Sequence, residues 1–192
     1  MMISLRYFIW TRYGTEAGEP IAEILRRKET ERAANNGIFL WGIGNVLGPS
    51  IQALEERVAD PCVVFSPIKA PPRTIDVQPF KVVSWTTGEL IDGTAYKLPV
   101  HSIVTSRAKR AHYALVCFSP QELHFEDVTE TVRFGTLRNL VSGRPLGRQQ
   151  VTAVVERCMT SCGDTYAYPA TVVSLYPPYY VKLKDPEQLD GC

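Results

Sequence analysis

The stretch from Asn36 to Ser50 constrains the fold of this chain more than any other. A strand-like apolar run ending at Trp41 leads directly into a glycine-rich turn, and a helix can begin at Pro49. The turn glycines are Gly42, Gly44 and Gly48. Glycine lets the backbone approach a ligand closely, and proline at the first helical position leaves free N–H groups that favour negative charge. The order strand, turn, helix therefore predicts a lip of backbone amides beside one indole and one carboxamide.

Short strand patterns outnumber helical patterns along the chain. Apolar patterns predict strands over residues 3–11, 62–65, 75–85, 96–104 and 112–118, and residues 132–140 are expected to form another short element. Helical patterns cover residues 18–35, 49–59 and 149–158. Strands do not alternate regularly with helices, as a doubly wound parallel sheet would require. We therefore predict an α+β fold, a small mixed β-barrel flanked by helices.

The domain organisation follows from length and from the last segment. A chain of 192 residues with 45% hydrophobic composition can bury one good core. We predict one domain over residues 1–158 and a C-terminal extension over residues 159–192. Because apolar residues of this extension need burial, we expect a strand or strap packed on the body rather than disorder. These residues are Val172, Val173, Leu175, Val181 and Leu183.

The net charge of +1 gives no overall field that would recruit nucleic acid or an anionic membrane. Binding of a polyanion would need a local basic patch, and two stretches offer one. The candidate phosphate-binding residues are Arg107, Lys109 and Arg110 in the first, and Arg144 and Arg148 in the second. A solvated turn is the alternative interpretation of the first cluster.

No apolar run approaches the roughly 20 residues that a membrane-spanning helix needs. The beginning of the sequence also lacks the charged and then apolar pattern of a signal peptide. We therefore expect a cytoplasmic protein that does not associate with membranes.

The helix predicted over residues 18–35 has a narrow apolar stripe and many charges. Its basic run Arg26-Arg27-Lys28 is balanced by the carboxylates of Glu23, Glu29 and Glu31. Balanced charge of this kind is typical of a solvated helix face.

The five cysteines are an odd number, which favours reduced thiols over a disulfide framework. Cys62 and Cys117 lie inside apolar strand patterns and are interpreted as small core residues. Cys158 and Cys162 have no second Cys/His pair at a matching spacing, so we expect neither a metal site nor a cofactor.

Local motifs of catalysis are missing from the sequence. The glycine turn after Trp41 has no lysine at its end, as a phosphate-binding loop requires, and lacks the third glycine of a dinucleotide fingerprint. Adjacent carboxylates such as Glu55 and Glu56 point in different directions and make poor acid/base partners. Binding is therefore favoured over catalysis.

The order of these features resembles the EVE and YTH domains, two branches of the PUA-like superfamily. The likeness rests on the strand Arg6–Trp10, the segment Gly37–Asn45 with Trp41, and the strand Val63–Ser66. It continues through Tyr113–Phe125 and Leu137–Val155, where an arginine-containing loop precedes a last helix in EVE domains. The resemblance covers roughly residues 3 to 158.

This resemblance implies a reader that flips a modified nucleotide into an aromatic cage. Trp41 would be one stacking wall, Gly42 a backbone contact and Asn45 a polar group at the pocket. Arg12 and Tyr13 would line it. Where YTH domains have a second tryptophan this chain has Cys117, so Trp85 or Phe118 would supply the second wall. A modified cytosine in DNA is therefore favoured over methylated adenine, and DNA over RNA.

Three alternatives stay open. Trp41 could be an ordinary core residue and the glycines simple turn formers. A small hydrolase of modified nucleosides on a PUA-like scaffold, as in the ASCH domains, is a second alternative, although their signature is not found here. The third is an interaction module whose aromatic tail, Tyr166–Tyr180, docks a protein partner.

Overall fold

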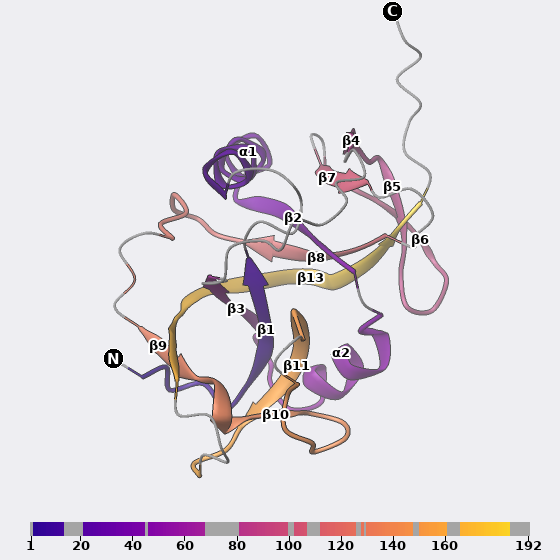
Figure 1. Ribbon diagram of the computed structural model, residues 1–192. Helices are drawn as coiled ribbons and strands as arrows, with labels where there is room; N and C mark the ends of the chain where they lie inside the picture. Colours follow the sequence, from indigo (N-terminus) through magenta and orange to yellow (C-terminus); the bar gives the residue numbers. More distant parts are fainter. Residues whose placement is uncertain are drawn as a thin grey trace, which may run out of the picture. The chain divides into compact units, whose positions relative to one another are not determined.

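The computed structural model describes residues 2–13, 21–44, 46–67, 81–99, 102–106, 112–125, 128, 130–147, 150–160 and 166–184. The described residues form two α-helices and thirteen strands, so the expected α+β class is confirmed (Figure 1). The helices are α1 (Ile21–Ala34) and α2 (Gly48–Glu55). The strands are β1 (Tyr7–Tyr13), β2 (Ile38–Ile43), β3 (Cys62–Pro67), β4 (Lys81–Ser84), β5 (Thr87–Glu89), β6 (Ala95–Lys97), β7 (Ile103–Ser106), β8 (Tyr113–Phe118), β9 (Thr131–Arg133), β10 (Leu137–Asn139), β11 (Thr152–Arg157), β12 (Ala167–Pro169) and β13 (Thr171–Leu183).

The chain divides into two compact units, each assembled from separate segments. The first unit takes Met1–Gly14, Leu47–Pro71 and Leu123–Leu175. The second takes Thr15–Val46, Pro72–Glu122 and Tyr176–Cys192. Neither unit ends at residue 158, and β13 contributes to both.

In the first unit, β1 lies between β3, which is parallel to it, and β11, which is antiparallel. β10 continues the sheet beyond β11, and residues 171–174 of β13 pair with β3 on the other side. Three consecutive β1 residues, Phe8, Ile9 and Trp10, are fully buried. A strand that is apolar on both faces is suited to this central position.

The prediction of a helix over residues 149–158 is wrong, because residues 152–157 form the strand β11. Thr152, Val154 and Val155 are β-branched, and β-branched side chains fit a pleated sheet better than a helix. β11 pairs on both edges, with β1 and with β10. The burial gained on both faces of a central strand decides the conformation here.

In the second unit the strand order is β6-β5-β13-β8-β2. β4 and β7 form a separate two-stranded sheet, and α1 packs against β2 and β7. Nine strands are joined by hydrogen bonds, most of them antiparallel, and the pairing branches at β13, which has β3, β5 and β8 as partners. The described strands do not close into a barrel. The segment expected as one strand over residues 96–104 is interrupted, with β6 ending at Lys97 and β7 beginning at Ile103.

Several burial expectations hold. Val173, Leu175, Val181 and Leu183 of β13 are buried, whereas Val172 is 40% exposed. Cys62 and Cys117 are buried free thiols, as expected of small core residues. In the described part of the chain, no helix is both long and apolar enough to span a membrane.

Candidate functional site

Trp41 belongs to β2, which pairs antiparallel with β8 in the second unit. In this register Trp41 lies opposite Leu115, and Ile43 lies opposite Tyr113. Residues directly opposite each other project from the same face of a sheet, and so do residues two apart on one strand. Trp41 and Ile43 are two apart on β2, so Trp41 shares one face with Tyr113, the partner of Ile43. The Trp41 side chain is buried, with 8% of its surface exposed, and is not the exposed indole that the sequence led us to expect.

Trp85 and Phe118 lie on the other side of β2 from Trp41. Leu40 packs in one core cluster with Trp85, and successive strand residues point to opposite faces. Phe118 lies opposite Ile38, which packs against the same cluster. Because of this period of two, neither aromatic ring faces the Trp41 indole. The prediction that Trp85 or Phe118 forms a second wall opposite Trp41 is therefore wrong.

Two aromatic residues of β2 and β8 share the face of Trp41, namely Phe39, which is fully buried, and Tyr113. The Tyr113 ring stacks on that of Tyr180, with centroids 5.5 Å apart and ring planes 9° from parallel. Tyr113 is partly exposed, while Tyr180 is 4% exposed. Tyr113 is the diagonal neighbour of Trp41 across the two strands, a position about 7–8 Å away that aromatic side chains can bridge. The alternation of residues 112–118 could have identified Tyr113 from the sequence.

The structure describes only some of the other residues expected at the lip of the pocket. Gly42 is exposed within β2, and Asn45 lies outside the described residues. A Cβ placed on Gly44 would meet no atom within 4 Å, so the space around Gly44 does not demand glycine. The helix α2 begins as expected, with a proline in its first turn, but it belongs to the first unit.

Arg12 and Tyr13 belong to the first unit, where they form a different cluster. Arg12 donates a hydrogen bond of 2.9 Å from Nη2 to the Tyr168 hydroxyl. Its guanidinium carbon lies 5.1 to 5.5 Å from the centres of three rings, those of Trp10, Phe134 and Tyr168. Tyr13 is 8% exposed and meets the Phe125 ring edge-on at 5.2 Å. Both residues take part in the packing of their own unit.

Of the candidate phosphate-binding residues, only Arg144 is described, because Arg107, Lys109, Arg110 and Arg148 lie outside the described residues. Arg144 is exposed in the turn after β10. Asn139 Oδ1 stabilises this turn by accepting hydrogen bonds from the backbone N–H groups of Val141 and Ser142, at 3.1 and 2.9 Å. A phosphate-binding role for these arginines and Lys109 stays a prediction.

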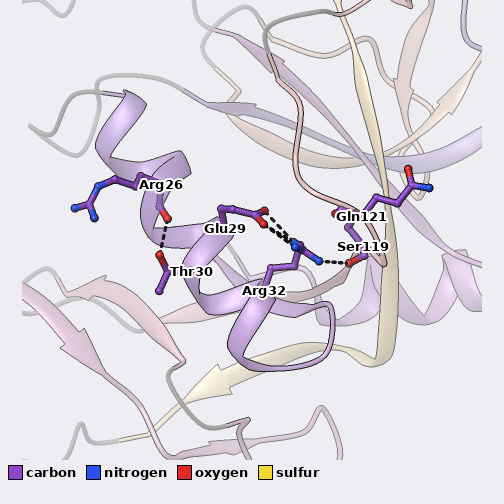
Figure 2. A network of polar contacts seen from close by, with 6 residues as sticks. All are labelled: Arg26, Glu29, Thr30, Arg32, Ser119 and Gln121. Atoms are coloured by element: carbon purple, nitrogen blue, oxygen red, sulfur yellow. Dashed lines mark hydrogen bonds and ion pairs between the residues drawn. The ribbon is translucent and has the colours of Figure 1, made fainter.

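Figure 2 shows how α1 is attached to the end of β8. Arg32 donates to both carboxylate oxygens of Glu29 and also, at 3.3 Å, to the backbone oxygen of Ser119. Its hydrogen bond to Glu29 raises the pKa of Arg32, so this group is charged at every physiological pH. The contact positions α1 beside the strand that bears Tyr113.

Within the described ranges, no three His, Cys, Asp or Glu side chains gather closely enough to hold a metal ion. Comparisons of the chain with family models, with curated proteins and with solved structures found no match.

Proposed function

We propose that this chain binds nucleic acid and stacks one everted base on Tyr113, with a modified base in DNA as the favoured ligand. One observation carries the proposal: Tyr113, backed by Tyr180, shares a sheet face with Trp41. A base site at Tyr113 replaces the slot expected between Trp41 and a second ring, because Trp85 and Phe118 lie on the opposite face of β2. Trp41 becomes an inner wall, because only 8% of it is exposed.

The physical basis is stacking on a ring that is already oriented. Base–aromatic stacking contributes about 1–3 kcal/mol per base. Tyr180 holds the Tyr113 ring in a stacked position, so little side-chain freedom is lost when a base binds. The other face of the Tyr113 ring is the one a base would meet.

The resemblance to EVE and YTH domains extends the proposal to the fold. The order β1-α1-β2-α2-β3 matches the order of elements from which the likeness was drawn, and this supports a PUA-like relationship. A non-enzymatic role and a cytoplasmic location belong to the same proposal.

The test is a panel of oligonucleotides that differ only in one base. Fluorescence anisotropy would compare plain DNA and RNA with strands carrying a modified cytosine or a methylated adenine. We expect one modified strand to bind more tightly than its plain counterpart. Equal affinity across the panel would contradict the proposal.

Two variants locate the site. Tyr113→Ala should weaken binding about 5- to 150-fold, the equivalent of 1–3 kcal/mol, and remove the preference for the modified base. Tyr166→Ala is the matched control, since Tyr166 is a tyrosine of the first unit with 39% of its surface exposed. If both variants bind like the unaltered protein, Tyr113 is not the stacking residue.

Trp41 needs a milder substitution because it is buried. Trp41→Ala should also abolish the preference, but it removes a large core side chain as well. Trp41→Phe keeps an aromatic ring at the position and should retain part of the preference. Circular dichroism of both variants separates lost binding from lost folding.

A further inference from the structure

Three lysines of the second unit project from one face of its sheet. Lys182 lies opposite Glu89 in the pairing of β13 with β5. The backbone N–H of Lys184 donates to the Thr87 oxygen, and Thr87 lies opposite Lys97 in the pairing of β5 with β6. Since residues opposite one another share a face, Lys97, Lys182 and Lys184 lie together on it. We call these three residues the lysine strip.

The opposite face of the same strands is the core. Val181 and Leu183, which alternate with Lys182 and Lys184, pack in a buried cluster with Leu40 and Leu98. The positions of the lysines are therefore determined by the strand period and not by a loose surface loop. The spacing of a strand puts Lys182 and Lys184 about 7 Å apart, and two strand spacings separate Lys184 from Lys97 by about 10 Å.

Glu89 organises two of these lysines. Its carboxylate forms ion pairs with Lys184 and, at 3.9 Å, with Lys182. The hydrogen bond from Lys184 holds the pKa of Glu89 below its usual value, so the carboxylate is ionised at neutral pH. The four side chains thus combine three positive charges with one negative charge. Lys182 in β13 and Lys184, which follows β13 directly, each keep 43% of their side-chain surface exposed, so a further anion can approach both side chains.

The strip continues from the stacked tyrosines. Lys182 stands two residues after Tyr180 in β13 and so points to the same side as the Tyr113–Tyr180 pair. Proteins that bind single-stranded nucleic acid combine aromatic stacking residues with a positively charged track for the backbone. Here both occur side by side on one face of one unit.

We infer that Lys97, Lys182 and Lys184 bind the phosphodiester backbone next to the base that stacks on Tyr113. This inference rests on the proposed function and assigns its phosphate contacts to residues that were not expected from the sequence. It favours a nucleic acid over an anionic membrane, because Glu89 lies among the lysines. Separate phosphates can avoid that carboxylate, whereas a continuous layer of lipid headgroups would be repelled by it.

The test measures salt dependence with a plain DNA oligonucleotide. Each phosphate contact contributes about 0.7 to the slope of log affinity against log salt for single strands. The triple variant Lys97→Gln/Lys182→Gln/Lys184→Gln should therefore lower the magnitude of this slope by about 2. It should also weaken binding at low salt by at least tenfold. An unchanged slope would overturn the inference.

Matched variants sharpen the result. Arg26→Gln removes one exposed positive charge from α1 of the same unit and should leave the slope unchanged. Glu89→Gln removes the carboxylate beside the lysines and should tighten binding several-fold. A loss of affinity in Glu89→Gln, or an Arg26→Gln effect as large as that of the triple variant, would count against the strip.

Failure of the strip and failure of base stacking give different results. If Tyr113→Ala has no effect while the triple variant flattens the salt slope, the strip holds and the proposed base site is wrong. If the reverse is found, the base site holds and the strip is wrong. A membrane partner would give a third result. The unaltered protein would co-sediment with phosphatidylserine vesicles and bind no oligonucleotide, and the triple variant would lose the vesicle binding. That result would overturn the inference.

Discussion

Lys28 Nζ lies 2.7 Å from Glu31 Oε2, and both side chains are buried, with 5% and 0% of their surface exposed. Glu31 also accepts the backbone N–H of Leu40 through Oε1, at 2.8 Å. A charged pair thus attaches α1 to β2. The sequence suggested a solvated charged face for this helix, which holds for the exposed pair Arg26–Glu23 and is wrong for Lys28 and Glu31.

Removing one member of this pair should be costly. Lys28→Met leaves the Glu31 carboxylate buried without the ammonium group, and we expect a loss of about 3–5 kcal/mol in the free energy of unfolding. The double variant Lys28→Met/Glu31→Gln should recover most of that loss, because no buried charge remains and the amide oxygen can still accept from Leu40. Urea unfolding measures both. Arg26→Gln is the exposed control and should change stability by less than about 1 kcal/mol.

Gly37 precedes β2 in a conformation that disfavours any side chain. Its φ is +96°, and a Cβ there would lie 2.7 Å from Phe118 Cε2 and 2.8 Å from the Ser119 oxygen. We expect Gly37→Ala to cost about 1–3 kcal/mol, from backbone strain and from the displaced neighbours. Gly44→Ala is the control, since its Cβ would meet nothing within 4 Å. Similar thermal unfolding midpoints for the two variants would refute this explanation.

The buried thiols should resist alkylation. Burial raises the pKa of Cys62 to about 11 and also raises that of Cys117. The thiolate is the reactive form, so at pH 8 both groups stay protonated and slow to react. In a Cys162→Ser/Cys192→Ser background, iodoacetamide should modify the partly exposed Cys158 first. Peptide mass spectrometry would show this, and labelling of Cys62 as fast as Cys158 in the folded protein would disprove it.

His112 should make the second unit sensitive to acid. Burial lowers the pKa of its imidazole, which lies 5.1 Å from the Trp85 ring. The unfolded chain therefore binds a proton at this imidazole more readily than the folded chain does. The contribution of His112 to the free energy of unfolding is complete above pH 6.5 and is lost as the pH falls below that value. His112→Gln should reduce the fall in unfolding midpoint between pH 7.5 and 5.5. His124→Gln, at an exposed position, should leave that fall unchanged.

Local sequence patterns predict helices and strands well where neighbouring residues determine the conformation. The strand at Ile38, the restart of the helix at Pro49 and the strand at Cys62 were all predicted, because apolar runs and helix-start signals are local. Residues 152–157 have the β-branched content of a strand, but the basic loop before them and the likeness to EVE domains favoured a helix. Their pairing with β1, about 145 residues earlier, is not a local signal.

The site was harder to predict than the elements. Trp41 could be placed on β2, but an apolar alternation does not reveal which of its two faces is covered. The same limit hid the relation of Trp41 to Trp85 and Phe118, which depends on cross-strand register. The sequence alone assigns Tyr180 and Lys182 to a C-terminal extension. Their significance depends on the strands that β13 contacts, and those strands come from earlier in the chain.

The long strand β13, yellow in Figure 1, has a consequence for how the polypeptide matures. Its first residues complete the sheet of one unit through β3, and its last residues complete that of the other through β5. Neither sheet can be finished until this late stretch has left the ribosome. A product cut short at residue 158 would lose a partner strand in both halves at once, and we expect it to aggregate or be degraded rather than survive as a smaller working protein.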